Sequence, residues 1–166
     1  RQETHSWLAS GWSVVERLNV LSVNLRNLEL SNTISQNFEN FTKNNINELV
    51  SLDKSIFDPY WQNSEAAFIE TLDSCNQNYL FKQYDEDLLV GYAILGVTRN
   101  FSFLQRFGIS LGYQNKGHGS ELLKNVLSFA KDNKYTNIRL NTQENNKAAK
   151  SLYAVSYTHL TLPTKA

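Results

Sequence analysis

The chain has 166 residues, 41% of them hydrophobic and 12% aromatic, which is typical of one folded domain with a core of its own. Sixteen Lys and Arg residues balance sixteen Asp and Glu residues, so the sequence lacks the basic surface expected of a nucleic-acid-binding or anionic-membrane-binding protein. The single cysteine, Cys75, cannot form an internal disulfide, and we recognise no signal peptide and no apolar run of membrane-spanning length. These features predict a cytoplasmic protein that binds neither nucleic acid nor membrane.

The first elements of the chain are predicted from hydrophobic spacing. Residues 14–25 mix branched and polar residues and could form a strand, whereas the Asn-rich and Ser-rich stretch 19–47 predicts a loop or a weakly ordered connection. Residues 45–52 and 64–75 have helical spacing, with Ser64 as a plausible N-cap of the second helix. We therefore expect a pair of helices after a largely irregular start.

The next elements are strands and helices in alternation. Residues 79–84 and 88–98 are rich in aromatic and branched side chains around a tight Asp-Glu-Asp turn, which predicts an antiparallel hairpin. A third strand follows at 101–110, then a glycine-containing turn with its helix, a fourth strand at 137–142 and a helix at about 146–153. This order predicts an α/β layered domain. The strands before and after the glycine turn should be parallel, with a cleft at their carboxyl ends.

The turn reads QNKGHGSELLKNVLSFA over residues 114–130, with Gly117 and Gly119 in front of a helical apolar pattern. Glycine permits left-handed backbone angles and close approach of a ligand to the main chain. A helix N-terminus offers unpaired N–H groups and a partial positive charge, which together suit a phosphate or pyrophosphate. The alternative is an ordinary strand-to-helix turn, and the turn alone does not decide between the two.

Several other sites are excluded by their motifs. The dinucleotide fingerprint is incomplete, because Asn141 stands near the strand end where an acidic residue is needed. Gly112 and Gly117 have phosphate-loop spacing, but His118 and Gly119 replace the Lys and the Ser or Thr of that loop. No cluster of His, Cys, Asp or Glu has metal-ligand spacing, and no G-x-S-x-G sequence is present, so we expect no metal and no catalytic triad.

Two motifs resemble the GNAT superfamily of N-acyltransferases. The Q-x-x-G-x-G sequence of Gln114, Gly117 and Gly119 is similar to the acyl-CoA-binding motif of that family. The sequence NKAAKSLY is similar to its N-x-x-A-x-x-L-Y helix, with matching residues Asn146, Ala149, Leu152 and Tyr153. The resemblance covers residues 45–153 and implies a mixed central sheet flanked by helices. Residues 1–44 are then a separate N-terminal segment, or the end of a preceding lobe of the same fold.

The resemblance implies that the chain binds acetyl-CoA and transfers its acetyl group to a primary amine of a small molecule or peptide. The backbone of Phe107 and Ile109 would pair with the pantetheine amides, and the N–H groups of 115–120 would hold the pyrophosphate. Asn146 would cap its helix and reach the cofactor, or act as an N-cap alone. The side chain of His118 is expected to face solvent. The full set of expected cofactor-binding residues is Phe107, Gly108, Ile109, Gln114, Asn115, Lys116, Gly117, His118, Gly119, Ser120 and Asn146.

The resemblance also implies catalytic roles. Tyr153 would protonate the leaving thiolate, although a tyrosine at this place could also be a core aromatic. Family members often have a glutamate where Phe103 stands, so deprotonation of the amine would use water or a carboxylate such as Glu65 or Glu70.

Two strand residues are weaker candidates. Gln105 and Arg106 flank the reacting region and are candidate substrate contacts. Arg106 is slightly better interpreted as an exposed or ion-paired strand residue.

The chain departs from the family pattern after Tyr153. GNAT chains usually continue through a Gly-Phe turn into two more strands, but residues 154–166 read AVSYTHLTLPTKA, which we interpret as a non-native tail with the C-terminal strands missing. A chain without methionine also suggests a fragment. The competing hypothesis is therefore a module of the same fold that binds acyl-CoA, or a partner, without catalysis.

Overall fold

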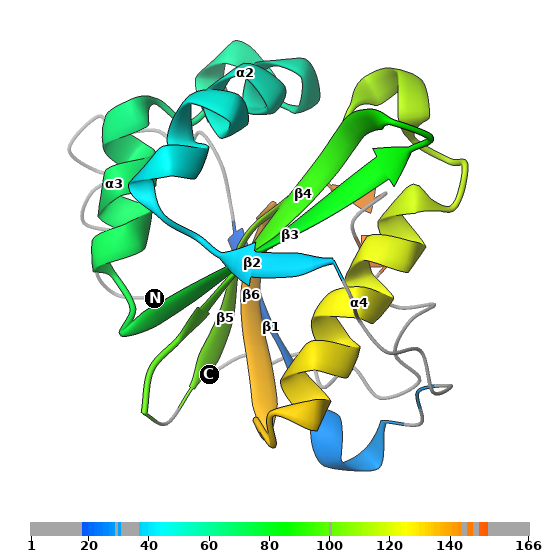
Figure 1. The fold of residues 1–166 in the computed structure, drawn as a ribbon. Helices are drawn as coiled ribbons and strands as arrows, with labels where there is room; N and C mark the ends of the chain where they lie inside the picture. The colour runs from blue at the N-terminus through cyan, green and yellow to red at the C-terminus, as the bar shows by residue number, and fades with distance from the viewer. Residues whose placement is uncertain are drawn as a thin grey trace, which may run out of the picture.

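The computed structural model describes residues 18–28, 30, 37–99, 101–143, 146–147 and 150–152. Within these residues one six-stranded sheet has helices α2 and α3 on one face and helix α4 on the other (Figure 1). The strand order is β1-β6-β5-β4-β3-β2. The β5 and β6 strands are parallel and the other neighbours are antiparallel. The predicted α/β architecture with a mixed sheet is confirmed.

The main elements follow one another as predicted from the middle of the chain onward. The helices are α2 (Ile46–Ile56), α3 (Glu65–Asp73) and α4 (His118–Asp132). The strands are β1 (Leu18–Asn24), β2 (Phe38–Asn40), β3 (Gln77–Asp85), β4 (Leu88–Val97), β5 (Ser102–Ile109) and β6 (Asn137–Gln143). Short 3-10 turns connect them, among them η3 (Pro59–Trp61) and η4 (Leu111–Tyr113). No helix in the described residues is long and apolar enough to cross a bilayer.

The Asn-rich stretch 19–47 is more structured than expected. Strand β1 pairs along its whole length with β6, from Leu18↔Gln143 to Asn24↔Asn137, and it buries Leu21 and Val23 against α4. Strand β2 pairs with the middle of β3. The many Asn and Ser residues of this stretch favoured the prediction of a loop, although some of them alternate with buried apolar residues in β1. Both strands therefore lie in the same sheet as the strands after residue 45, while residues 14–17 of the expected strand fall outside the described part.

Helix α2 extends beyond its predicted end at Leu52. The prediction was too short because a charged residue lies on the buried face of the helix. Ile46, Leu49, Asp53 and Ile56 are all buried at helical spacing. Asp53 interrupts the apolar pattern in the sequence, which is why the pattern predicted a shorter helix. In α3 the predicted N-cap is confirmed, since Ser64 Oγ accepts a hydrogen bond from the Ala67 amide at 3.2 Å.

Candidate active site

Strands β5 and β6 part from each other halfway along β5. Their parallel ladder runs from Ser102↔Ile138 to Leu104↔Leu140 and ends there within the described residues. Beyond it β5 continues against β4 as far as Gly91↔Ile109, and β6 continues against β1. A bulge at Gln105 lies at the same point. We call the separation of residues 105–109 from β6 the β5–β6 parting.

The backbone direction along the parting follows from strand alternation. The Ser110 amide donates to the Val90 carbonyl at 2.8 Å, so every second residue back along β5 bonds toward β4. The intervening residues, Phe107 and Ile109, therefore direct their N–H and C=O groups toward the parting. The Gln114 side chain, the first residue of the glycine motif, donates to the Ile109 carbonyl at 2.9 Å and fixes the turn to the end of the strand.

The glycine turn forms the uncapped N-terminus of α4, as predicted. Asn115 and Gly117 have φ angles of 60° and 92°, in the left-handed region. Gly117 is the N-cap, no side chain caps the helix, and the first helical hydrogen bond runs from the Glu121 amide to the Gly117 carbonyl at 3.0 Å. In the described structure the amides of residues 117–120 therefore have no acceptor. A Cβ added to Gly117 would meet nothing within 4 Å, so the turn opens onto free space.

The second motif lies against the first. The Lys150 amide donates to the Asn146 carbonyl at 3.1 Å, which starts a helical turn at Asn146 as the motif predicted. A Cβ added to Gly119 would lie 3.4 Å from Leu152 Cδ2 and 3.7 Å from Ile109 Cγ1. Gly119 in the first turn of α4 therefore lies near both Leu152 and Ile109 at the end of β5. Ala149 and Tyr153 lie outside the described residues.

The expected solvent-facing orientation of His118 is wrong. Its side chain is only 13% exposed, and its Nε2 lies 3.5 Å from Asp85 Oδ1. Its Nδ1 lies 3.5 Å from the side-chain nitrogen Nε2 of Gln83, and this nitrogen also donates to the Glu121 carboxylate at 2.9 Å. The first turn of α4 abuts the end of β3, and this contact encloses the ring. His118 therefore joins α4 to β3 at the edge of the glycine turn.

Arg106 is an ion-paired strand residue. Its Nε and Nη2 donate to the two carboxylate oxygens of Asp53 at 2.9 and 2.8 Å, and Nη2 also donates to the Trp61 carbonyl at 2.6 Å. Asp53 is fully buried and accepts two further hydrogen bonds, from the Tyr92 hydroxyl and from the Asn63 amide at 2.7 Å. Burial, together with the Asp53 charge, raises the pKa of Tyr92 above its ordinary value.

The Asp53 cluster was not found from the sequence. The predicted helix 45–52 stops before Asp53, and Tyr92 lies inside the predicted strand 88–98 without a feature that marks it. The available signal was the polar pair Gln105 and Arg106 inside an otherwise apolar strand, which needs polar partners when it is buried. The Gln105 amide donates to Ser74 Oγ and, at 3.4 Å, to the Thr71 carbonyl at the end of α3.

Phe103, which stands where the resemblance would put a glutamate, lies in the middle part of β5 beside β6. Phe103 pairs with Arg139 in the register, and its ring centroid lies 6.3 Å from that of Phe101. Glu65 and Glu70 are exposed on α3. Among the described residues no group of three or more His, Cys, Asp or Glu side chains is arranged to hold a metal ion.

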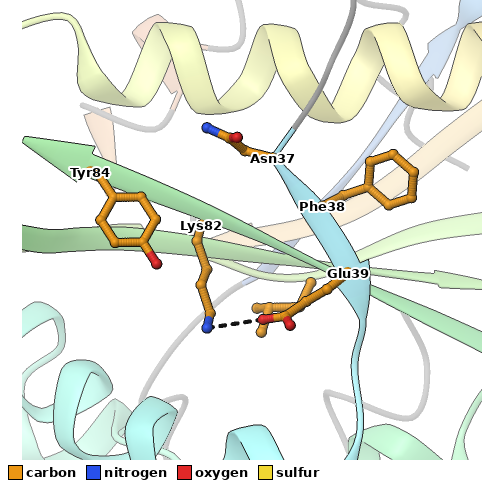
Figure 2. Close-up of a pocket in the computed structure, with 6 residues that line it drawn as sticks. Asn37, Phe38, Glu39, Lys82 and Tyr84 are labelled. Atoms are coloured by element: carbon orange, nitrogen blue, oxygen red, sulfur yellow. Dashed lines mark ion pairs between the residues drawn. The ribbon is translucent and has the colours of Figure 1, made fainter. Parts of the chain in front are cut away.

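A pocket of about 280 Å³ lies along β2 and β3, where Glu39 and Lys82 point toward each other (Figure 2). Its lining residues are Asn37, Phe38, Glu39, Leu80, Lys82 and Tyr84. Lys82 bridges Glu39 and Glu48 of α2 at 2.9 and 2.7 Å. Burial would lower the pKa of Lys82, but these hydrogen bonds and charges raise it above the ordinary value. The pocket is therefore bordered by an ion-pair network whose two glutamates are about half exposed.

The mixed six-stranded sheet with helices on both faces is a fold shared with solved N-acetyltransferases. The acetyltransferase (GNAT) family matches residues 46–157, more than half of the chain. The chain belongs to this family. A comparison with curated proteins finds no match.

Solved structures share the fold at low sequence identity. A GCN5-related N-acetyltransferase from Sphaerobacter thermophilus has a TM-score of 0.70 at 14% identity, over 96% of this chain and 53% of that one. The ribosomal-protein-S18-alanine N-acetyltransferase from Escherichia coli has a TM-score of 0.60 at 18% identity, over 71% of this chain and 74% of that one. PaiA N-acetyltransferase from Thermoplasma acidophilum, solved with coenzyme A, has a TM-score of 0.56 at 14% identity, over 71% and 86%. The chain thus spans about half the length of the Sphaerobacter protein.

Proposed function

We propose that the protein is an N-acetyltransferase that transfers the acetyl group of acetyl-CoA to a primary amine by direct attack. The observation that carries the proposal is the β5–β6 parting beside the uncapped N-terminus of α4. A strand edge suits the amides of the pantetheine arm, and a helix N-terminus suits the pyrophosphate. The family match and the coenzyme A complex of a protein with the same fold support this assignment.

The residues present fit such a donor. Four amides at 117–120 have no acceptor in the described structure, and the helix dipole adds positive potential at the same place. Gly117 leaves free space beside them. Along β5 the Ile109 amide is directed toward the parting, while Gln114 occupies its carbonyl. In this proposal Ile109 and Phe107 orient the pantetheine arm, residues 115–120 bind the pyrophosphate, and Asn146 contributes a further cofactor contact.

The chemistry proposed for the chain is a single acyl transfer. The neutral amine attacks the acetyl carbonyl, a C–N bond forms and the C–S bond breaks. A main-chain N–H of residues 107–109 stabilises the negative charge on the carbonyl oxygen. Before the attack the amine loses its extra proton to water or to an exposed carboxylate such as Glu65 or Glu70. Tyr153 donates its proton to the departing thiolate and regains one that the attacking nitrogen releases.

The acceptor is proposed only as a class, the primary amine of a small molecule or a peptide. The Escherichia coli protein of the same fold acts on an alanine of ribosomal protein S18, which illustrates the peptide case. We also propose a cytoplasmic location, because the single cysteine cannot form an internal disulfide.

Acetyl transfer is tested by incubating the protein with acetyl-CoA and a panel of amines: amino acids, polyamines, aminoglycosides and peptides with free N-termini. Release of the coenzyme A thiol and the mass of the acetylated product are measured together. We expect product with at least one amine, and its loss in the Gly117→Val variant, whose added side chain fills the space beside the amides. Binding of acetyl-CoA without transfer to any amine would instead favour the non-catalytic module.

A further inference from the structure

The end of β5 packs against α2 at the residues that no longer pair with β6. Alternate residues of the strand face α2 and contact it in turn. Arg106 pairs with Asp53. Gly108 lies so close to α2 that a Cβ there would come 2.4 Å from Ile56. Beyond the strand, Ser110 Oγ is 2.9 Å from Ser55 Oγ. The C-terminal turns of α2 therefore contact residues 106–110, which no longer pair with β6.

Arg106 is the polar anchor of this support. It joins three elements, since its guanidinium bonds Asp53 on α2 and the Trp61 carbonyl in η3 while its own backbone belongs to β5. Its Cζ also lies 3.6 Å from the centroid of the Phe57 ring. Its side chain is 16% exposed and that of Asp53 is fully buried. A guanidinium with two carboxylate bonds, a carbonyl bond and a ring contact has little freedom to move.

A charged pair is a costly way to fill a buried position. Well-packed apolar residues of similar volume often give equal or greater stability than a buried ion pair, so stability alone is a weak explanation for this one. What the pair adds is a fixed geometry, because a bidentate contact sets both the distance and the angle between its partners. The strand that it orients is the one whose next residues, Phe107 and Ile109, direct their backbone toward the parting.

We propose that Arg106, through its contacts with Asp53 and the Trp61 carbonyl, is a positioning residue that sets the end of β5 to receive the pantetheine arm. This inference rests on the proposed function. Arg106 touches neither the glycine turn nor α4 in its described contacts, so we expect its effect to fall mainly on the strand half of the donor site. The pyrophosphate half is formed by the glycine turn, whose one described bond to the strand end runs from Gln114 to Ile109, beyond Arg106.

The separation into halves gives a direct test with two probes. Calorimetry measures binding of acetyl-CoA and of adenosine 3′-phosphate 5′-diphosphate, the fragment that carries the pyrophosphate without the pantetheine arm. In Arg106→Lys the charge stays but the bidentate contact and the Trp61 bond are lost. We expect acetyl-CoA affinity to fall by about tenfold, the effect of one or two hydrogen bonds, while fragment affinity changes by less than about twofold.

A second variant is needed because a substitution of Arg106 that leaves the buried Asp53 carboxylate unpaired would destabilise the protein. The Asp53→Asn/Arg106→Met double variant removes both charges and leaves an acceptor for the Tyr92 hydroxyl or the Asn63 amide. The matched control is Lys82→Met, which removes an ion-paired cation from β3 and should leave both affinities unchanged. Thermal denaturation establishes that each variant is folded at the temperature of the titration.

The outcomes are distinct. A selective loss of acetyl-CoA affinity in both Arg106 variants supports the positioning role. Equal affinity of the folded variants and the parent for acetyl-CoA, or a parallel fall in both affinities, overturns it. If the parent protein binds neither probe, the proposed function itself fails and the inference fails with it.

Discussion

Gly119 faces Leu152 so closely that a Cβ added to Gly119 would come 3.4 Å from Leu152 Cδ2. The two residues belong to the two sequence motifs of the site, the glycine turn and the NKAAKSLY segment. The contact joins these motifs into one surface beside Ile109 at the end of β5. At Gly119 there is therefore room for a small side chain but not for a large one, whereas Gly117 is needed for its backbone angle.

Substitutions at Gly119 should depend on size. Alanine gains helix propensity of about 1 kcal/mol and meets only the flexible end of Leu152, so Gly119→Ala should be neutral or slightly stabilising. Gly119→Leu should displace Leu152 and lower the free energy of unfolding by about 1–3 kcal/mol. Urea denaturation compares the two. A Gly119→Leu protein as stable as the parent would show that the two segments are not packed as described.

Substitutions at Gly117 should depend on backbone angle, because its φ is 92° and its surroundings are open. Gly117→Ala should destabilise by about 1–2 kcal/mol, and Gly117→Asn by less, since Asn tolerates left-handed angles. Gly112 serves as the control: it also has open space around it, and its φ lies outside the left-handed region. Equal unfolding free energies for Gly117→Ala and Gly112→Ala would contradict the left-handed N-cap.

Stability should fall at alkaline pH because of Tyr92. Its folded-state pKa is raised above the ordinary value of 10.0 by burial and by Asp53. The unfolded chain therefore releases this proton first, so the contribution of Tyr92 to stability is complete below pH 10.0 and is lost as the pH rises above it. Urea midpoints between about pH 8 and pH 11 should show this loss.

The matched variant for this measurement is Tyr92→Phe, which removes the ionisable group and its bond to Asp53. At neutral pH it should be less stable by about 1–3 kcal/mol, and its stability should fall less steeply above pH 10.0. A smaller alkaline loss remains, because the raised pKa of Lys82 acts in the same direction. Identical pH slopes for parent and variant would contradict the buried Tyr92 hydroxyl.

The role of Tyr153 is tested by Tyr153→Phe, which keeps the ring and removes the proton donor. If the hydroxyl protonates the thiolate, kcat should fall by roughly 10- to 10000-fold with little change in acetyl-CoA affinity. Steady-state kinetics with an amine from the panel gives kcat, and calorimetry gives the affinity. An unchanged kcat would leave the cofactor site in place and remove the acid role.

The sequence was informative where local rules decide the structure. The Ser64 N-cap, the hairpin of β3 and β4, and the glycine turn before α4 all follow from short-range spacing and turn chemistry, and all are present. Strand β1 was only partly foreseen. Its pairing with β6 joins residues far apart in the chain, and no short-range rule reports such a contact.

In the candidate site, the positions of the motif residues were predictable from the sequence, but the contacts between elements were not. The place of Gln114 and Gly117 followed from the motif, but the bond from the Gln114 side chain to the Ile109 carbonyl did not. The enclosure of His118 depends on where β3 ends relative to α4, and the Asp53 pair with Arg106 depends on how α2 lies on β5. These contacts arise from packing between elements, which the sequence pattern of one element does not contain.

The central claim, a coenzyme A donor site on the glycine turn, is tested most directly by calorimetric titration of acetyl-CoA into the parent protein, Gly117→Val and Gly112→Ala, each shown to be folded. Gly117 borders the free amides of α4, so a valine there both fills the space beside them and strains the left-handed N-cap. We predict saturable binding by the parent and by Gly112→Ala, and an affinity reduced by about tenfold or more in Gly117→Val, the scale of losing hydrogen bonds to a charged group. Equal affinity in all three proteins, or no binding by the parent, would contradict the account.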